Sequence, residues 1–145
     1  MPPTLFLLFF LVSPALSATR FIISGSISCS SPFQYNMRVI EIDAPFKNDV
    51  LYKDHLQSPP SSPVFFNISL SDSHDGVSNM YELAIDVLHN CNSLVYTKNS
   101  VMRYFLGYFP ITHGTYYVKY DMNVTDMGGP YVWPLDVWSP ALDRV

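Results

Sequence analysis

The most regular pattern in the chain lies between residues 81 and 91, where mostly apolar side chains at the odd-numbered positions alternate with a more polar set at the even-numbered positions. The acids Glu82 and Asp86 belong to the even-numbered set. Successive side chains of a strand point to opposite faces of a sheet, so the pattern predicts a strand with one buried face and with both acids pointing outward. The predicted buried face consists of Tyr81, Leu83, Ile85, Val87, His89 and Cys91.

Other short segments with strand composition are separated by turn residues. Three prolines within Ser58–Pro63 exclude a regular ladder there and favour an extended surface loop. Strands this short, with turn signals between them, predict an all-β fold, an antiparallel β-sandwich of about seven strands. The other predicted strands are residues 21–29, 37–43, 50–54, 64–70, 101–109 and 116–124.

Cys29 and Cys91 are the two cysteines of the chain, and each is in phase with the predicted buried face of its own strand. In an oxidising compartment an even number of cysteines indicates a disulfide. A bridge would close a loop of about 62 residues and stabilise the fold by roughly 4 kcal/mol. The alternative is a pair of reduced, buried thiols.

The N-terminus predicts export. The apolar run Leu5–Val12 spans only about 12 Å as a helix, against ~30 Å for the hydrocarbon core of a bilayer. The small residues Ala15, Ser17 and Ala18 follow it, so residues 1–17 are predicted to be a signal peptide, cleaved after Ser17 or after Ala18. The alternatives are a hydrophobic strand or a membrane anchor. The predicted mature protein is secreted and extracellular.

Two N-glycosylation sequons begin at Asn67 and Asn123. Each asparagine falls on the predicted outward face of its strand, where a glycan would have room, so both are predicted glycosylation sites.

Residues 126–145 form a tail rich in proline and tryptophan. Trp133 and Trp138 are candidate ligand contacts, because exposed aromatic side chains are frequent anchors at interfaces. The alternative is a tail that folds back over one end of the sandwich.

The charge and the polar motifs exclude several classes of function. The net charge of −4 argues against nucleic acid and against an anionic membrane surface as partners, and no later apolar run is long enough to span a bilayer. Histidines at positions 55, 74, 89 and 113 lack the spacing of a zinc site, so no metal and no cofactor are predicted. His89 is a candidate ligand contact or pH-sensitive group; the alternative is a buried imidazole bonded to a backbone carbonyl.

Several segments together resemble the nematode transthyretin-like family, as a divergent member. They are Gly25–Cys29, Met37–Asp43, Asn48–Leu51, Phe65–Leu70 and Leu83–Asn92, within residues 21–125. No cysteine follows Cys91, although the family usually has further ones. The resemblance implies a transthyretin-like sandwich over residues 18–125 that binds a lipid, a small apolar ligand or a cell-surface receptor outside the cell. It specifies no oligomeric state.

The transthyretin fold also includes a hydrolase of 5-hydroxyisourate, whose tetrapeptide Tyr-Arg-Gly-Ser does not occur in this sequence. No nucleophile elbow or phosphate loop is present either. The chain is therefore predicted to bind rather than to catalyse, with no catalytic residue. The second reading is a structural cuticle or matrix component that acts through its aromatic tail, and the hydrolase is the third.

Overall fold

The structure, a computed structural model, describes residues 18–42, 48–72, 79–92, 99–112 and 114–130. The predicted signal peptide at residues 1–17 lies outside the described residues, and so do Trp133 and Trp138. No helix among the described residues is long and apolar enough to cross a bilayer.

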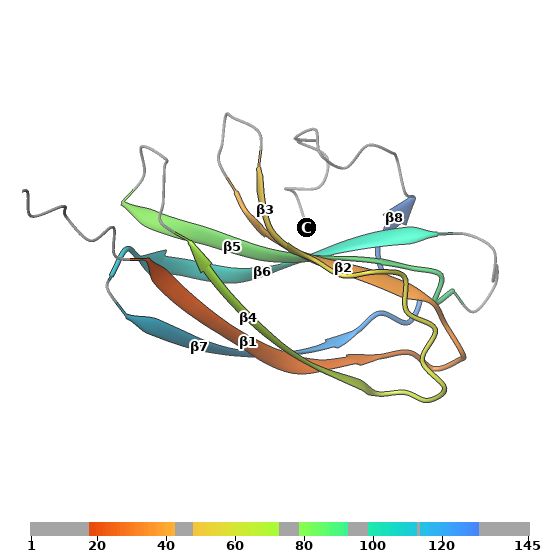
Figure 1. Cartoon of the computed structure of the whole chain (residues 1–145). Helices are drawn as coiled ribbons and strands as arrows, with labels where there is room; N and C mark the ends of the chain where they lie inside the picture. Colours follow the sequence, from red (N-terminus) through yellow and green to blue (C-terminus); the bar gives the residue numbers. More distant parts are fainter. Residues whose placement is uncertain (1–17, 43–47, 73–78, 93–98, 113, 131–145) are drawn as a thin grey trace, which may run out of the picture.

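Two sheets lie one above the other, as Figure 1 shows. The three-stranded sheet has the order β4-β1-β7, and the second sheet has the order β3-β2-β5-β6-β8. The prediction of an all-β, sandwich-like fold is thereby confirmed. The strands are β1 (Thr19–Ser28), β2 (Tyr35–Glu41), β3 (Asp49–Lys53), β4 (Val64–Asp72), β5 (Met80–His89), β6 (Ser100–Pro110), β7 (Thr115–Asn123) and the two-residue β8 (Gly129–Pro130).

One strand pair differs from the predicted antiparallel arrangement. β1 pairs with β4 in the antiparallel sense but with β7 in the parallel sense. The chain crosses from one sheet to the other between β6 and β7, so that β7 reaches the free edge of β1 running in the same direction. Gly25 of β1 permits this pairing, because a side-chain carbon at this position would collide with the backbone carbonyl of Tyr120 on β7.

The predicted buried faces form the core between the sheets. Phe21 of β1 contacts Tyr81 of β5 edge to face, with ring centroids 5.2 Å apart, and stacks on Tyr116 of β7 at 5.5 Å. Both Phe21 and Tyr81 are fully buried. The other side chains on the predicted buried face of β5, namely Leu83, Ile85, Val87 and His89, are also buried.

Asp86 lies on the outer face of β5, as predicted, but the expectation that it faces solvent is wrong, because it is only 2% exposed. Arg38 of β2 and Arg103 of β6 are its cross-strand neighbours on either side. Arg38 Nη2 lies 2.9 Å from Asp86 Oδ2, and Arg103 Nε lies 2.7 Å from Asp86 Oδ1. The position of Asp86 in the strand predicts an exposed side chain, but two long arginine side chains enclose its carboxylate.

Replacing Asp86 is expected to destabilise the fold strongly. Asp86→Ala should lower the free energy of unfolding in urea by about 3 kcal/mol, because it removes the carboxylate that two buried guanidinium groups contact. Glu82→Ala, on the same face of the same strand, should cost less than about 1 kcal/mol. Equal losses in the two variants would contradict the inferred role of the ion pairs.

Candidate functional site

The predicted disulfide joins Cys29 and Cys91, with Cα atoms 6.0 Å apart. Cys29 directly follows β1, and Cys91 lies two residues beyond β5, so the bridge connects one strand end from each sheet. Several backbone groups are bonded around it: Ser62 Oγ accepts from Cys29 N–H at 2.9 Å, and Cys91 C=O accepts from Asp126 N–H at 3.0 Å. We call this end of the sandwich the disulfide junction.

His89 lies inside the disulfide junction and is 1% exposed. Its Nδ1 accepts a hydrogen bond from the backbone N–H of Cys91 at 3.2 Å. The other ring nitrogen, Nε2, then carries the proton and has no hydrogen-bond partner of good geometry among the described residues. Burial lowers the pKa of His89, and the backbone of Met127 offsets part of this shift.

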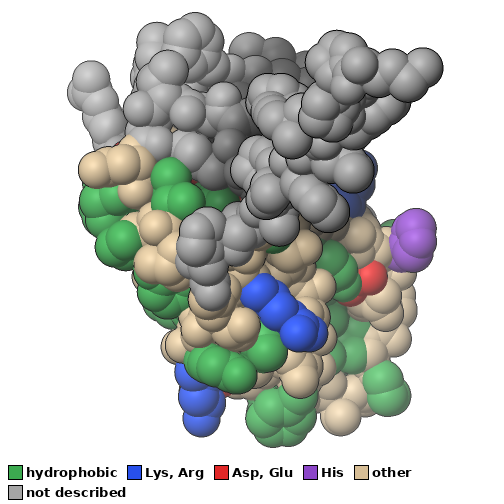
Figure 2. All heavy atoms as spheres, turned by 60° about the vertical axis from the view of Figure 1, so that its left-hand side comes forward, with side chains coloured by type: hydrophobic (Ala, Val, Ile, Leu, Met, Phe, Trp, Pro, Cys, Tyr) green, Lys and Arg blue, Asp and Glu red, His purple; other side chains and the backbone are tan. Residues whose placement is uncertain are grey.

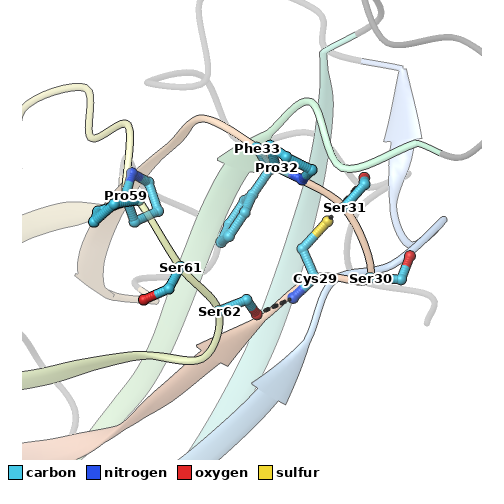
Figure 3. A pocket seen from close by; sticks show the side chains of 9 residues that line it. Cys29, Ser30, Ser31, Pro32, Phe33, Pro59, Ser61 and Ser62 are labelled. Carbon is cyan, nitrogen blue, oxygen red and sulfur yellow. Dashed lines mark hydrogen bonds between the residues drawn. The ribbon is translucent and has the colours of Figure 1, made fainter.

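A hollow of about 290 Å³ opens at the disulfide junction between two loops. Figure 3 shows the loop after β1 on one side and the proline loop on the other, with the ring of Phe33 between them. No charged side chain lines this hollow. The complete lining is Cys29, Ser30, Ser31, Pro32, Phe33, Pro59, Pro60, Ser61 and Ser62.

The two sequon asparagines share one face of the three-stranded sheet. Asn67 of β4 lies opposite Ser24 of β1, and Asn123 of β7 lies opposite Ser28 of β1. Because residues 24 and 28 of one strand point to the same side, both asparagines lie on the outer face of β4-β1-β7, and both are exposed. Asn123 Oδ1 also accepts from Thr125 N–H at 3.0 Å. We call this surface the sequon face.

A second surface follows β6 along one edge of the five-stranded sheet. β8 pairs only with Ser100 and Val101, so from Met102 onward β6 pairs with β5 alone among the described strands. Phe105 is 44% exposed and Tyr108 is 59% exposed, and their rings contact each other with centroids 5.1 Å apart. We call residues 102–110 the β6 edge. Figure 2 shows hydrophobic side chains in separate patches, with Lys and Arg among them, on one side of the molecule.

The structure brings together only some of the residues that the sequence singles out. Cys29, Cys91 and His89 meet at the disulfide junction, whereas Asn67 and Asn123 lie on the sequon face. Roles of His89 and of the two tryptophans as ligand contacts stay predictions. The β6 edge was missed, because its signal, an aromatic strand with no charge after Arg103, indicates a buried strand equally well.

The neutral, buried imidazole of His89 is expected to make the fold sensitive to acid. The pKa of His89 is lower in the folded than in the unfolded chain, where it is about 6.5, so the unfolded chain takes up a proton first. The stability that His89 contributes is therefore complete above about pH 6.5 and is lost as the pH falls toward its folded pKa, by at most about 1.4 kcal/mol per pH unit.

Urea unfolding between about pH 7.5 and about pH 5.5 tests this expectation. The variant His89→Gln, whose side-chain oxygen can still accept from Cys91 N–H, should lose part of the pH dependence. His55→Gln, at an exposed loop position, should retain all of it. The same pH dependence in His89→Gln as in the unmodified protein would refute the assignment.

Neither a protein-family model, nor a curated protein, nor a solved structure matches this chain.

Proposed function

We propose that the chain is a secreted, transthyretin-like glycoprotein domain that binds another extracellular protein. Its export is supported by the leader-like residues 1–17 and by the disulfide, which is typical of oxidising compartments. The transthyretin-like assignment is supported by the positions of the resembling segments, since Gly25–Cys29 and Leu83–Asn92 correspond to the ends of β1 and β5 that the disulfide joins.

A contact at the surface fits this sandwich better than a ligand in its interior. Side chains fill the space between the sheets, and Phe21, Ile23, Leu83 and Ile85 each have no exposed surface. The hollow at the disulfide junction is lined mainly by serine and proline, a poor match for a lipid or a small apolar molecule. Of the three predicted kinds of partner, a protein is therefore the one we propose.

The β6 edge is the observation on which this proposal depends. An exposed sheet edge presents unpaired backbone groups that a strand of another protein can bond, and folds usually protect such edges by short length or by charge. β3 has five residues and carries Asp49 and Lys53, and β7 carries Lys119 and Asp121. β4 carries the sequon asparagine Asn67.

β6 is longer than β3 and carries no charge over most of its length. It has eleven residues, and no charged residue occurs from Tyr104 to Pro110. Arg103 is only 9% exposed and is engaged with Asp86. Gly107, at a φ of 131°, accompanies a bulge relative to β5. We propose that an extended segment of the partner adds to this edge and covers Phe105 and Tyr108.

The other two readings have less support. The cuticle or matrix reading rests on Trp133 and Trp138, which lie outside the described residues. A hydrolase is not proposed, because the hydrolase tetrapeptide does not occur in the sequence.

Glycans on the sequon face would leave the β6 edge as the available surface. When the full chain is expressed in a secretory eukaryotic cell, the protein in the medium should lose mass in two steps on treatment with peptide-N-glycosidase. Asn67→Gln and Asn123→Gln should each remove one step, and the double variant should show none. A single unglycosylated species in the medium would contradict the predicted use of the sequons, while retention in the cell with residues 1–17 attached would contradict export.

Photo-crosslinking tests the β6 edge directly. A photoreactive phenylalanine analogue at position 105 of the secreted protein should form adducts with an extracellular protein, and the same analogue at position 117 should not. Tyr117 is a matched control, because it is an aromatic residue of a strand and is 78% exposed. The peptide of the partner that forms the adduct can then be synthesised. It should bind the unmodified protein and should protect the amides of residues 103–109 from hydrogen exchange.

Two variants distinguish binding at the β6 edge from binding elsewhere on the protein surface. Tyr108→Lys should weaken binding of that peptide by about tenfold, through loss of the aromatic contact and addition of charge at the edge. Tyr117→Lys should leave binding unchanged. Adducts formed mainly at position 117, or composed only of a second copy of this chain, would overturn the proposal.

A further inference from the structure

The two cysteines of the disulfide have different surroundings. Cys29 is 8% exposed and lines the hollow at the disulfide junction, as Figure 3 shows. Cys91 is 1% exposed and is not among the residues that line the hollow. Of the two cysteines, Cys29 is therefore the one beside the hollow.

The walls of the hollow suit a small thiol. They carry serine hydroxyls and no charge, so they do not repel the thiolate form that reacts with disulfides. Ser31 Oγ lies 3.6 Å from Cys29 Sγ, and Ser31 is partly exposed. This hydroxyl can donate a hydrogen bond to a thiolate that approaches Cys29.

The other side of the bond has a group that can stabilise a departing sulfur. Thr125 Oγ lies 3.8 Å from Cys91 Sγ. A disulfide sulfur carries no hydrogen, so any hydrogen bond here must be donated by the threonine hydroxyl. The same oxygen accepts from Ser30 N–H at 3.0 Å, which leaves its own hydrogen free to point at Cys91 Sγ. A donor at this position favours the thiolate of Cys91 as leaving group.

We propose that the hollow is a thiol-exchange site at which a small thiol of the glutathione class opens the disulfide at Cys29. The thiolate attacks Cys29 Sγ, a mixed disulfide forms between the small thiol and Cys29, and the Cys29–Cys91 bond breaks. The electron pair of that bond remains on Cys91 Sγ, which takes up a proton from water. A second thiol can then release Cys29, so that two thiols are oxidised to one disulfide while the protein disulfide is reduced.

The product of the first step should stay folded. Backbone bonds still connect the strands at the disulfide junction, including Val124 N–H to Ser28 C=O at 2.9 Å. Ser62 Oγ still accepts from Cys29 N–H. The covalent link between the two sheets is lost, however, so that thiol exchange would loosen this end without dissolving the core. This inference uses neither secretion nor the β6 edge, and it therefore stands or falls separately from the proposed function.

The test uses the purified, oxidised full chain, treated with reduced glutathione in native buffer at neutral pH and quenched with N-ethylmaleimide. Peptide mapping by mass spectrometry should find glutathione on Cys29 and the maleimide on Cys91, with about a tenfold preference over the reverse pattern. Equal labelling of both cysteines, or a rate that rises steeply in low urea, would show that the disulfide opens only through unfolding and would overturn the proposal.

Two matched variants test the role of the hollow. Ser31→Leu removes the hydroxyl and adds bulk beside Cys29 Sγ, and it should slow the exchange by about fivefold. Ser71→Leu makes the same change at an exposed position of β4, outside the lining of the hollow, and should leave the rate unchanged. If Ser31→Leu fails to fold, the labelling pattern of the unmodified protein still decides the question. Glutathione found mainly on Cys91 would overturn it.

Discussion

The disulfide between Cys29 and Cys91 is the constraint on which one whole end of this sandwich depends. It joins the end of β1 in one sheet to the end of β5 in the other. By limiting the freedom of the unfolded chain, a cross-link over such a loop stabilises the fold by roughly 4 kcal/mol. At the same end of the sandwich, Cys91 N–H donates a hydrogen bond to the buried imidazole of His89, and Cys29 N–H donates one to Ser62 Oγ of the proline loop that lines the hollow.

The two sheets present different outer faces, and this difference suggests separate uses. The outer face of β4-β1-β7 carries both exposed sequon asparagines, together with the exposed rings of Phe65 and Tyr117. The outer face of the five-stranded sheet contains the enclosed carboxylate of Asp86 and, along β6, an exposed pair of aromatic rings. Glycans on the first surface and a protein partner at the second would not compete for space, which makes the proposed roles mutually compatible.

The candidate site was only partly predictable from sequence. The disulfide pairing followed from two cysteines in phase with buried faces, and the outward positions of Asn67 and Asn123 followed from the same alternation. Asp86 shows the limit of that reasoning. Alternation predicts the face on which a side chain lies, whereas its exposure depends on neighbours from other strands, here Arg38 and Arg103.

The sequence by itself determined the strands and their buried faces, because side-chain alternation is a local property of extended backbone. It also determined which two sulfurs could pair. Only the tertiary structure decided that β7 runs parallel to β1, that Asp86 is enclosed and that β6, from Met102 onward, pairs with β5 alone among the described strands. Each of these depends on which strands become neighbours across long stretches of chain, and the alternation within a strand carries no information about its neighbours.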